Sequence, residues 1–133
     1  MAAKSQPDTA GPGPARFKDL CLDANDHQRL ADWWCRALGY IRREEGESRP
    51  PEQPVPIVDP EGRGPLIWIN PVPEQKTVKN RMHIDVFGSP EDLLKAGATL
   101  LRARDDEEVF WDVLADPEGN EFCVFTPPED GTG

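Results

Sequence analysis

The residue types best suited to chemistry lie near the middle of the chain, at His83 and Asp85. Successive side chains of a strand point to opposite faces, so these two residues share one face of a predicted strand. Met82, Ile84 and Val86 form the opposite, apolar face. This pattern is typical of the wall of a polar cavity. His83 is therefore a candidate catalytic residue, and the open alternatives are a metal ligand or a wall residue hydrogen-bonded to Asp85.

Further polar, aromatic and thiol side chains on three other predicted strands could bind a ligand in the same cavity. Together with Asp85, the candidate ligand-binding residues are Asp19, Asp23, Trp68, Asn70 and Cys123. Trp68 could stack on a planar compound or simply fill the interior. Cys123 would be a nucleophile only with a base within reach, and otherwise is a buried, inert thiol.

The elements that must position these residues fall into two similar halves. In the first half, the pattern predicts a strand at 16–24, followed by a helix that is capped by Asn25 and Asp26 and ended by Gly39. It then predicts strand character at 40–45, a loop at 46–56 with a short edge strand after it, and a strand at 65–70. In the second half, it predicts a strand around His83, a helix from Ser89 to Gly97, strands at 98–104, 109–115 and 121–125, and a hairpin turn at 116–120. Each half therefore reads as strand, helix, strand, strand, strand.

The ends of the chain lack this periodicity. Residues 1–15 are rich in Pro, Gly and Ala, which predicts a disordered tail, and residues 127–133 predict a second short tail. The expected domain is residues 16–126, with one module at 16–71 and the other at 80–126.

Composition restricts the class of protein. The chain has 133 residues and a formal net charge of -10, which argues against nucleic acid or an anionic membrane as partner. No apolar run approaches the roughly 18 residues that span a bilayer, and the start of the chain lacks the apolar segment of a signal peptide. The three cysteines have no CxxC spacing, which predicts reduced thiols and a cytoplasmic protein.

Motif residues span nearly all of the chain between the two tails. They are Leu22-Asp23 with Asp26, Leu30–Trp34 continuing into Ala37–Gly39, Val72–Glu74 with Lys76–Asp85, and Asp116–Phe122. These motifs resemble the vicinal oxygen chelate superfamily, also called the glyoxalase/bleomycin resistance/dioxygenase superfamily, and in particular the glyoxalase-like proteins common in actinobacteria. The resemblance implies an α+β fold in which two βαβββ modules form a curled mixed sheet around one cavity, with the helices outside.

The resemblance also implies where a metal would bind. In metal-using members of the superfamily, four strands each offer one ligand, usually histidine, glutamine or glutamate. Aligned by motif, these positions fall on Asp19, His83, Cys123 and the strand that carries Trp68 and Asn70. Because only His83 has the expected type, the prediction is no metal cofactor, and one divalent ion is the alternative.

The predicted function is that of a metal-free, glyoxalase-like protein that binds or converts a small planar organic compound. The alternative is a metal-dependent lyase, isomerase or dioxygenase with an altered ligand set around His83. The clustered carboxylates Asp19, Asp23 and Asp85 favour a neutral or cationic ligand over an acidic one. Exposed strand edges and one flank of the tryptophan-bearing helix predict a homodimer.

Overall fold

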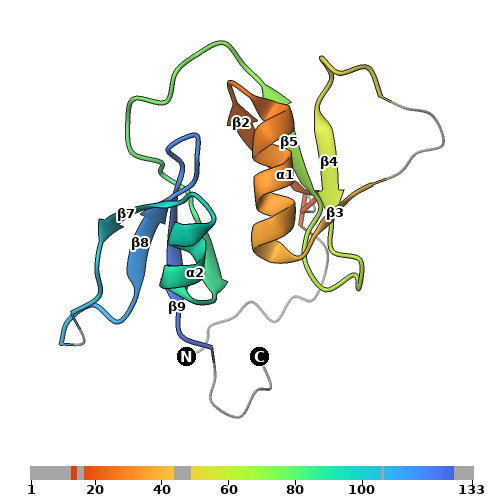
Figure 1. Cartoon of the computed structure of the whole chain (residues 1–133). Helices are drawn as coiled ribbons and strands as arrows, with labels where there is room; N and C mark the ends of the chain where they lie inside the picture. Colours follow the sequence, from red (N-terminus) through yellow and green to blue (C-terminus); the bar gives the residue numbers. More distant parts are fainter. Residues whose placement is uncertain (1–12, 15–16, 44–48, 106, 128–133) are drawn as a thin grey trace.

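The computed structural model describes residues 13–14, 17–43, 49–105 and 107–127 (Figure 1). The two predicted tails, 1–15 and 127–133, lie almost entirely outside these residues, as do the first three positions of the predicted loop at 46–56. Within the tails, the described residues 13, 14 and 127 belong to no helix or strand.

The chain folds into two successive βαβββ modules, as the sequence predicted. The first contains β2 (Leu20–Ala24), α1 (His27–Leu38), β3 (Ile41–Arg42), β4 (Val55–Val58) and β5 (Ile67–Pro71). The second contains β6 (Ile84–Phe87), α2 (Pro90–Lys95), β7 (Thr99–Arg102), β8 (Asp112–Ala115) and β9 (Glu121–Phe125). The α+β fold class, with the helices outside the sheets, is confirmed.

Each module builds its own four-stranded mixed sheet. The strand orders are β2-β5-β4-β3 and β6-β9-β8-β7. In both sheets the first strand of the module pairs in parallel with the last, and the other pairs are antiparallel. The two first strands, β2 and β6, are therefore edge strands. Figure 1 shows α1 in front of the β2–β5 pair and α2 in front of β9.

Both helices start where the sequence predicted, and α1 also ends there, whereas α2 ends at Lys95 with Ala96, not Gly97, as its C-cap. The side chain of Asp26 accepts a hydrogen bond from the backbone N–H of Arg29, and Gly39 closes α1 in the left-handed conformation with φ 74°. In the second module, Ser89 caps the start of α2 and Pro90 occupies its first turn, where the missing N–H leaves no bond unmade.

Two local predictions differ from the structure. The strand after the long loop, β4, is an interior strand between β5 and β3, not an edge strand. Its Pro56 has no N–H to donate, but its carbonyl accepts a hydrogen bond from the N–H of Arg43 at 2.9 Å, directly after β3. Met82 does not share the apolar face of Ile84 and Val86, because β6 begins only at Ile84 and Met82 is 77% exposed.

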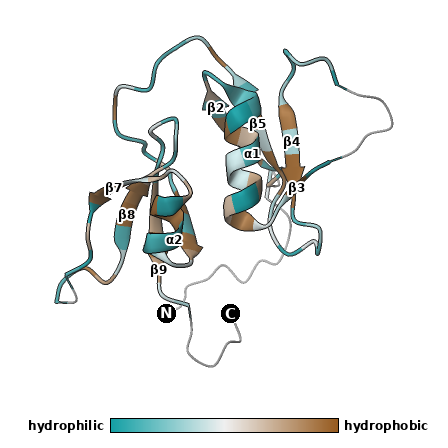
Figure 2. Cartoon of the chain, in the orientation of Figure 1, coloured by the Kyte–Doolittle hydropathy of each residue, from teal (hydrophilic) through white to brown (hydrophobic). Residues whose placement is uncertain are grey.

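The core lies between the helices and the sheets and joins the two modules. Trp34 of α1 is fully buried, with its ring 5.2 Å from that of Phe122 on β9. Its indole N–H donates to Asp116 at 2.9 Å, while Trp33 donates to the carbonyl of Ala96 at 3.0 Å. Figure 2 shows the buried strand β4 as predominantly hydrophobic.

The described helices are also too short and too polar to act as membrane spans.

Candidate functional site

The face of the second sheet away from the helices carries the candidate catalytic residue and its acidic neighbour. Ile84 and Val86 pack against the core, whereas His83 and Asp85 are exposed on the opposite face. The alternation predicted for this strand is therefore correct from Ile84 onward. His83 directly precedes β6, so its side chain projects at the end of the strand.

His83, Asp85 and Cys123 form one cluster on this face. Asp85 and Cys123 are opposite each other in the parallel β6–β9 pair, and the His83 Nε2 atom lies 3.1 Å from Asp85 Oδ1. The possible ligand atoms of the three residues all lie within 4.8 Å of one another. Burial raises the pKa of the Cys123 thiol, and the neighbouring Asp85 carboxylate raises it further. As it stands, this thiol is therefore a poor nucleophile near neutral pH.

The first sheet carries a second group of the predicted residues. Trp68 donates its indole N–H to Asp19 at 3.1 Å, and Asn70 donates to Asp23 at 3.4 Å. The hydrogen bond from Lys18 to Asp19 lowers the pKa of Asp19, so this carboxylate stays ionised at neutral pH.

The Trp68 ring has cationic neighbours. The guanidinium groups of Arg43 and Arg49 lie 5.3 Å and 5.2 Å from the ring centroid, a cation–π arrangement. This ring is therefore already contacted by side chains of the chain itself.

A cavity of about 430 Å³ lies between the modules. Its apolar walls come from both halves, with Leu20, Leu22, Ile67, Ile84, Phe122 and the buried Trp34. Its polar lining consists of Asp19, Cys21, Asn80, His83, Asn120 and Glu121, and Phe17 and Met82 complete the wall. None of the described residues that line it is a lysine or an arginine. Asp19 and His83 thus meet in one cavity, whereas Trp68, Asn70, Asp85 and Cys123 do not line it.

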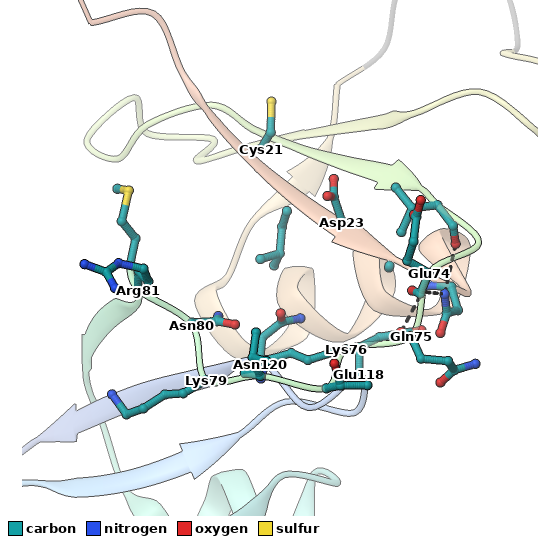
Figure 3. Close-up of a pocket in the computed structure, with 17 residues that line it drawn as sticks. Cys21, Asp23, Glu74, Gln75, Lys76, Lys79, Asn80, Arg81, Glu118 and Asn120 are labelled. Atoms are coloured by element: carbon teal, nitrogen blue, oxygen red, sulfur yellow. Dashed lines mark hydrogen bonds between the residues drawn. The ribbon is translucent and has the colours of Figure 1, made fainter.

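A second, more polar cavity of about 530 Å³ adjoins the first. Figure 3 shows β2 along one side and, along the other, the linking segment (residues 72–83) and the β8–β9 turn. Asp23 lines this cavity, and Asn80, Met82, Leu22 and Asn120 line both cavities. The sequence did not lead to the prediction that the linking segment lines a cavity, although its cationic residues could have indicated this.

Glu121 anchors the linking segment to β9. It accepts hydrogen bonds from the backbone N–H of Asn80 at 3.0 Å and from Lys76 at 3.3 Å. Burial opposes ionisation of Glu121, but these hydrogen bonds lower its pKa overall. The wall between the two cavities is therefore held in place by a charged pair.

The β8–β9 turn performs a structural task that the sequence did not indicate. The two carboxylate oxygens of Glu118 accept from the backbone N–H groups of Asn25 and Asp26, at 3.0 Å and 2.8 Å. Asn25 in turn donates to the carbonyls of Val72 and Glu74 in the linking segment. The turn of the second module therefore fixes the start of α1 in the first.

A family model described as the glyoxalase-like domain matches residues 19–125. The chain belongs to this family. No curated protein matches it in sequence. The narrower kinship with actinobacterial proteins stays a prediction.

Solved structures of low sequence identity share the fold of this glyoxalase-like chain. TioX from Micromonospora sp. ML1 is 17% identical, with 83% of this chain and 97% of that chain covered and a TM-score of 0.55. A glyoxalase/bleomycin resistance protein/dioxygenase family enzyme from Burkholderia phytofirmans PsJN is 18% identical, with 79% and 93% covered and a TM-score of 0.57. The fosfomycin resistance protein FosX from Listeria monocytogenes, in complex with Mn(II) and 1S,2S-dihydroxypropylphosphonic acid, is 10% identical, with 87% and 95% covered and a TM-score of 0.61.

The donor atoms of the glyoxalase-like chain do not match the four-strand ligand set that the resemblance implies. Asp19 is hydrogen-bonded to Lys18 and Trp68 and does not belong to the group formed by His83, Asp85 and Cys123. Among the described residues, the only group of three or more histidine, cysteine and acidic side chains close enough to hold a metal is His83, Asp85 and Cys123. These nitrogen, oxygen and sulfur donors fit a thiophilic divalent ion such as zinc better than manganese or magnesium.

Proposed function

We propose that this glyoxalase-like protein binds a small organic compound with a planar, apolar body, neutral or cationic, in the cavity between its modules. The chemistry of the cavity walls carries the proposal. They are mainly apolar and have two carboxylates, Asp19 and Glu121, with no lysine or arginine among the described lining residues. A volume of about 430 Å³ is in the usual range for sites that enclose a small ligand.

The expected charge of the ligand differs from that in the FosX complex, whose ligand is a phosphonic acid. Hydrogen bonding to Lys18 lowers the pKa of Asp19, and Glu121 is also held ionised. The lysines paired with these carboxylates, Lys18 and Lys76, do not line the cavity. An anionic ligand in the cavity would therefore face the two carboxylates, whereas a cation would be attracted to them. Recognition would then rest on the chain's own side chains, without the four-strand metal set.

A thermal-shift screen with matched compounds tests the proposal. Each planar skeleton is offered as an amine, as an uncharged analogue and as a carboxylic acid. We expect some amines and uncharged analogues to raise the melting temperature, because a ligand that binds only the folded state stabilises it by mass action. The corresponding acids should have no effect. Stabilisation by the acids alone would contradict the proposal.

The variant Asp19→Asn tests whether the compound binds in the cavity beside Asp19. The amide oxygen can still accept from Trp68, so the variant removes the charge and keeps the fold. We expect affinity for the amine to fall roughly fivefold, because the attraction between opposite charges is lost, with affinity for the uncharged analogue unchanged. Glu61→Gln is the matched control, because it removes the same charge from an exposed pair with Arg63 that does not line the cavity. An equal loss in both variants would contradict binding beside Asp19.

A metal-dependent lyase, isomerase or dioxygenase is the second candidate, and the cluster of His83, Asp85 and Cys123 favours it. An ion bound there would supply Lewis-acid chemistry beside the cavity, since His83 belongs to both. The products of a reaction with the compound found in the screen would distinguish an enzyme from a binding protein.

We further propose that the chain acts as a homodimer in the cytoplasm. Two edge strands, β2 and β6, support the dimer, as do the exposed apolar side chains Phe17 and Met82 at the cavity wall. The cytoplasmic location is supported by three cysteines that are all free.

A further inference from the structure

The second sheet brings three different metal-binding side chains to one face. His83 and Asp85 are two positions apart, so they project to the same side at the start of β6. Asp85 is directly opposite Cys123 in the parallel β6–β9 pair. A nitrogen, an oxygen and a sulfur donor are therefore held by two neighbouring strands of one rigid sheet.

The separations suit a single ion. Two donors on one tetrahedral zinc ion lie about 3.2–3.8 Å apart, given bond lengths of about 2.0–2.3 Å. His83 Nε2 and Asp85 Oδ1 are already 3.1 Å apart, and no pair of possible ligand atoms is more than 4.8 Å apart. A side-chain movement of about 1 Å is enough to bring the sulfur within the separation of two ligands on one zinc ion, and the backbone need not move.

Exposure leaves room for a fourth ligand. The side chains of His83 and Asp85 are 42% and 58% exposed, whereas Cys123 is buried. Three protein ligands with one side open to solvent are the arrangement found at catalytic zinc sites, where water or substrate takes the fourth position.

We propose that His83, Asp85 and Cys123 bind one thiophilic divalent cation of the zinc class on the exposed face of the second module. This site lies within one module and includes Asp85, which is not among the four positions implied by the resemblance. It does not use Asp19 or any group of the first sheet. Its expected preference for a thiophilic ion differs from the Mn(II) that is bound in the FosX complex.

Cobalt titration tests the proposal, with full-length protein made without an affinity tag. Co²⁺ is the probe because a thiolate bound to cobalt gives a charge-transfer absorption in the near ultraviolet that oxygen and nitrogen donors do not give. We expect one Co²⁺ per chain with this absorption, its loss when one equivalent of Zn²⁺ is added, and a higher melting temperature with either ion. Binding without the absorption, or no binding, would overturn the proposal.

Variants assign the ligands. Cys123→Ser should remove the charge-transfer absorption, and Asp85→Asn and His83→Gln should each weaken cobalt binding at least tenfold. Cys21→Ser and His27→Gln are the controls, because they change a different cysteine and the other histidine of the chain, both outside the cluster. An unchanged absorption in Cys123→Ser, or its loss in Cys21→Ser, would contradict the assignment.

The choice of variants allows a misfolded variant, and a failure of the cavity proposal, to be distinguished from a failure of the cation site. Asp85 is exposed, so Asp85→Asn tests the site even if the buried Cys123→Ser variant does not fold. The cation site and the proposed ligand cavity are tested by different residues, because Asp19→Asn should leave cobalt binding unchanged and Asp85→Asn should leave the cavity lining intact. Failure of one proposal is therefore distinguishable from failure of the other.

Discussion

At the scale of single residues, Asp105 shows how one carboxylate organises a loop. Its Oδ1 atom accepts from the backbone N–H groups of Glu107, Glu108 and Val109, at 2.9, 2.9 and 3.0 Å. These bonds favour the ionised form, and the bond from Val109 contributes most. The pKa of Asp105 falls from 3.8 to about 2 as a result.

This pKa shift predicts a contribution to stability that depends on pH. Because the pKa is lower in the folded state, the contribution is fully present above pH 3.8 and is lost as the pH falls towards about 2. Asp105→Asn should therefore lower the free energy of unfolding at pH 5 and approach the wild type near pH 2. Urea unfolding at several pH values measures both curves. Glu107→Gln is the charge-matched control, and parallel curves for Asp105→Asn and the wild type would contradict the prediction.

Local patterns in the sequence sufficed for some single residues and failed for others. The exposed face of His83 and Asp85 follows from alternation along one strand, and the caps Asp26 and Ser89 follow from residue type. The proximity of Asp85 to Cys123 depends on the register of β6 and β9, whose first residues, Ile84 and Glu121, are 37 positions apart in the sequence. No local pattern encodes a pairing over this distance.

At the scale of elements, α1 and the β8–β9 turn form the joint between the modules. Trp34 on α1 donates to Asp116, which also accepts from the backbone N–H groups of Glu118 and Asn120. Burial raises the pKa of Asp116 despite these hydrogen bonds. The turn motif predicted as a hairpin is thus also a buried polar anchor for the first helix.

A double-mutant cycle measures the coupling energy between Trp34 and Asp116 at this joint. Trp34→Phe removes the donor and Asp116→Asn the negatively charged acceptor, so each should lower the free energy of unfolding by about 1–3 kcal/mol. The two losses should not add, with a coupling of about 0.5–3 kcal/mol in urea unfolding. Trp33→Phe is the matched control, since Trp33 donates to Ala96 instead, and it should couple less strongly to Asp116→Asn. If the losses in the free energy of unfolding from Trp34→Phe and Asp116→Asn were strictly additive, the predicted coupling would be contradicted.

The order of elements could be predicted from the sequence, but the place of β4 in its sheet could not. Proline and charged residues before Val55 are typical of an edge strand, yet β4 pairs on both sides. Its position depends on β3, a strand of only two residues that follows from the turn at Gly39. Strand order is a property of the whole sheet, so composition around one strand does not determine it.

At the scale of the whole molecule, each module leaves its first strand without a partner on one side among the residues that the structure describes. The free edges of β2 and β6 belong to different sheets and adjoin the cavity between the modules, through Leu20, Leu22 and Ile84. An unpaired strand edge presents N–H and C=O groups that a second chain can bind. Phe17 and Met82, 73% and 77% exposed, add apolar surface at the same cavity.

A homodimer would cover these surfaces by symmetric pairing, because in a two-fold dimer each exposed patch meets its equivalent or its complement. We expect light scattering at micromolar concentration to give twice the 14.8 kDa mass of the chain. The melting temperature should also rise with protein concentration, since association stabilises the folded state by mass action. A monomer mass together with a melting temperature independent of concentration would exclude the dimer, and the cavity would then be complete within one chain.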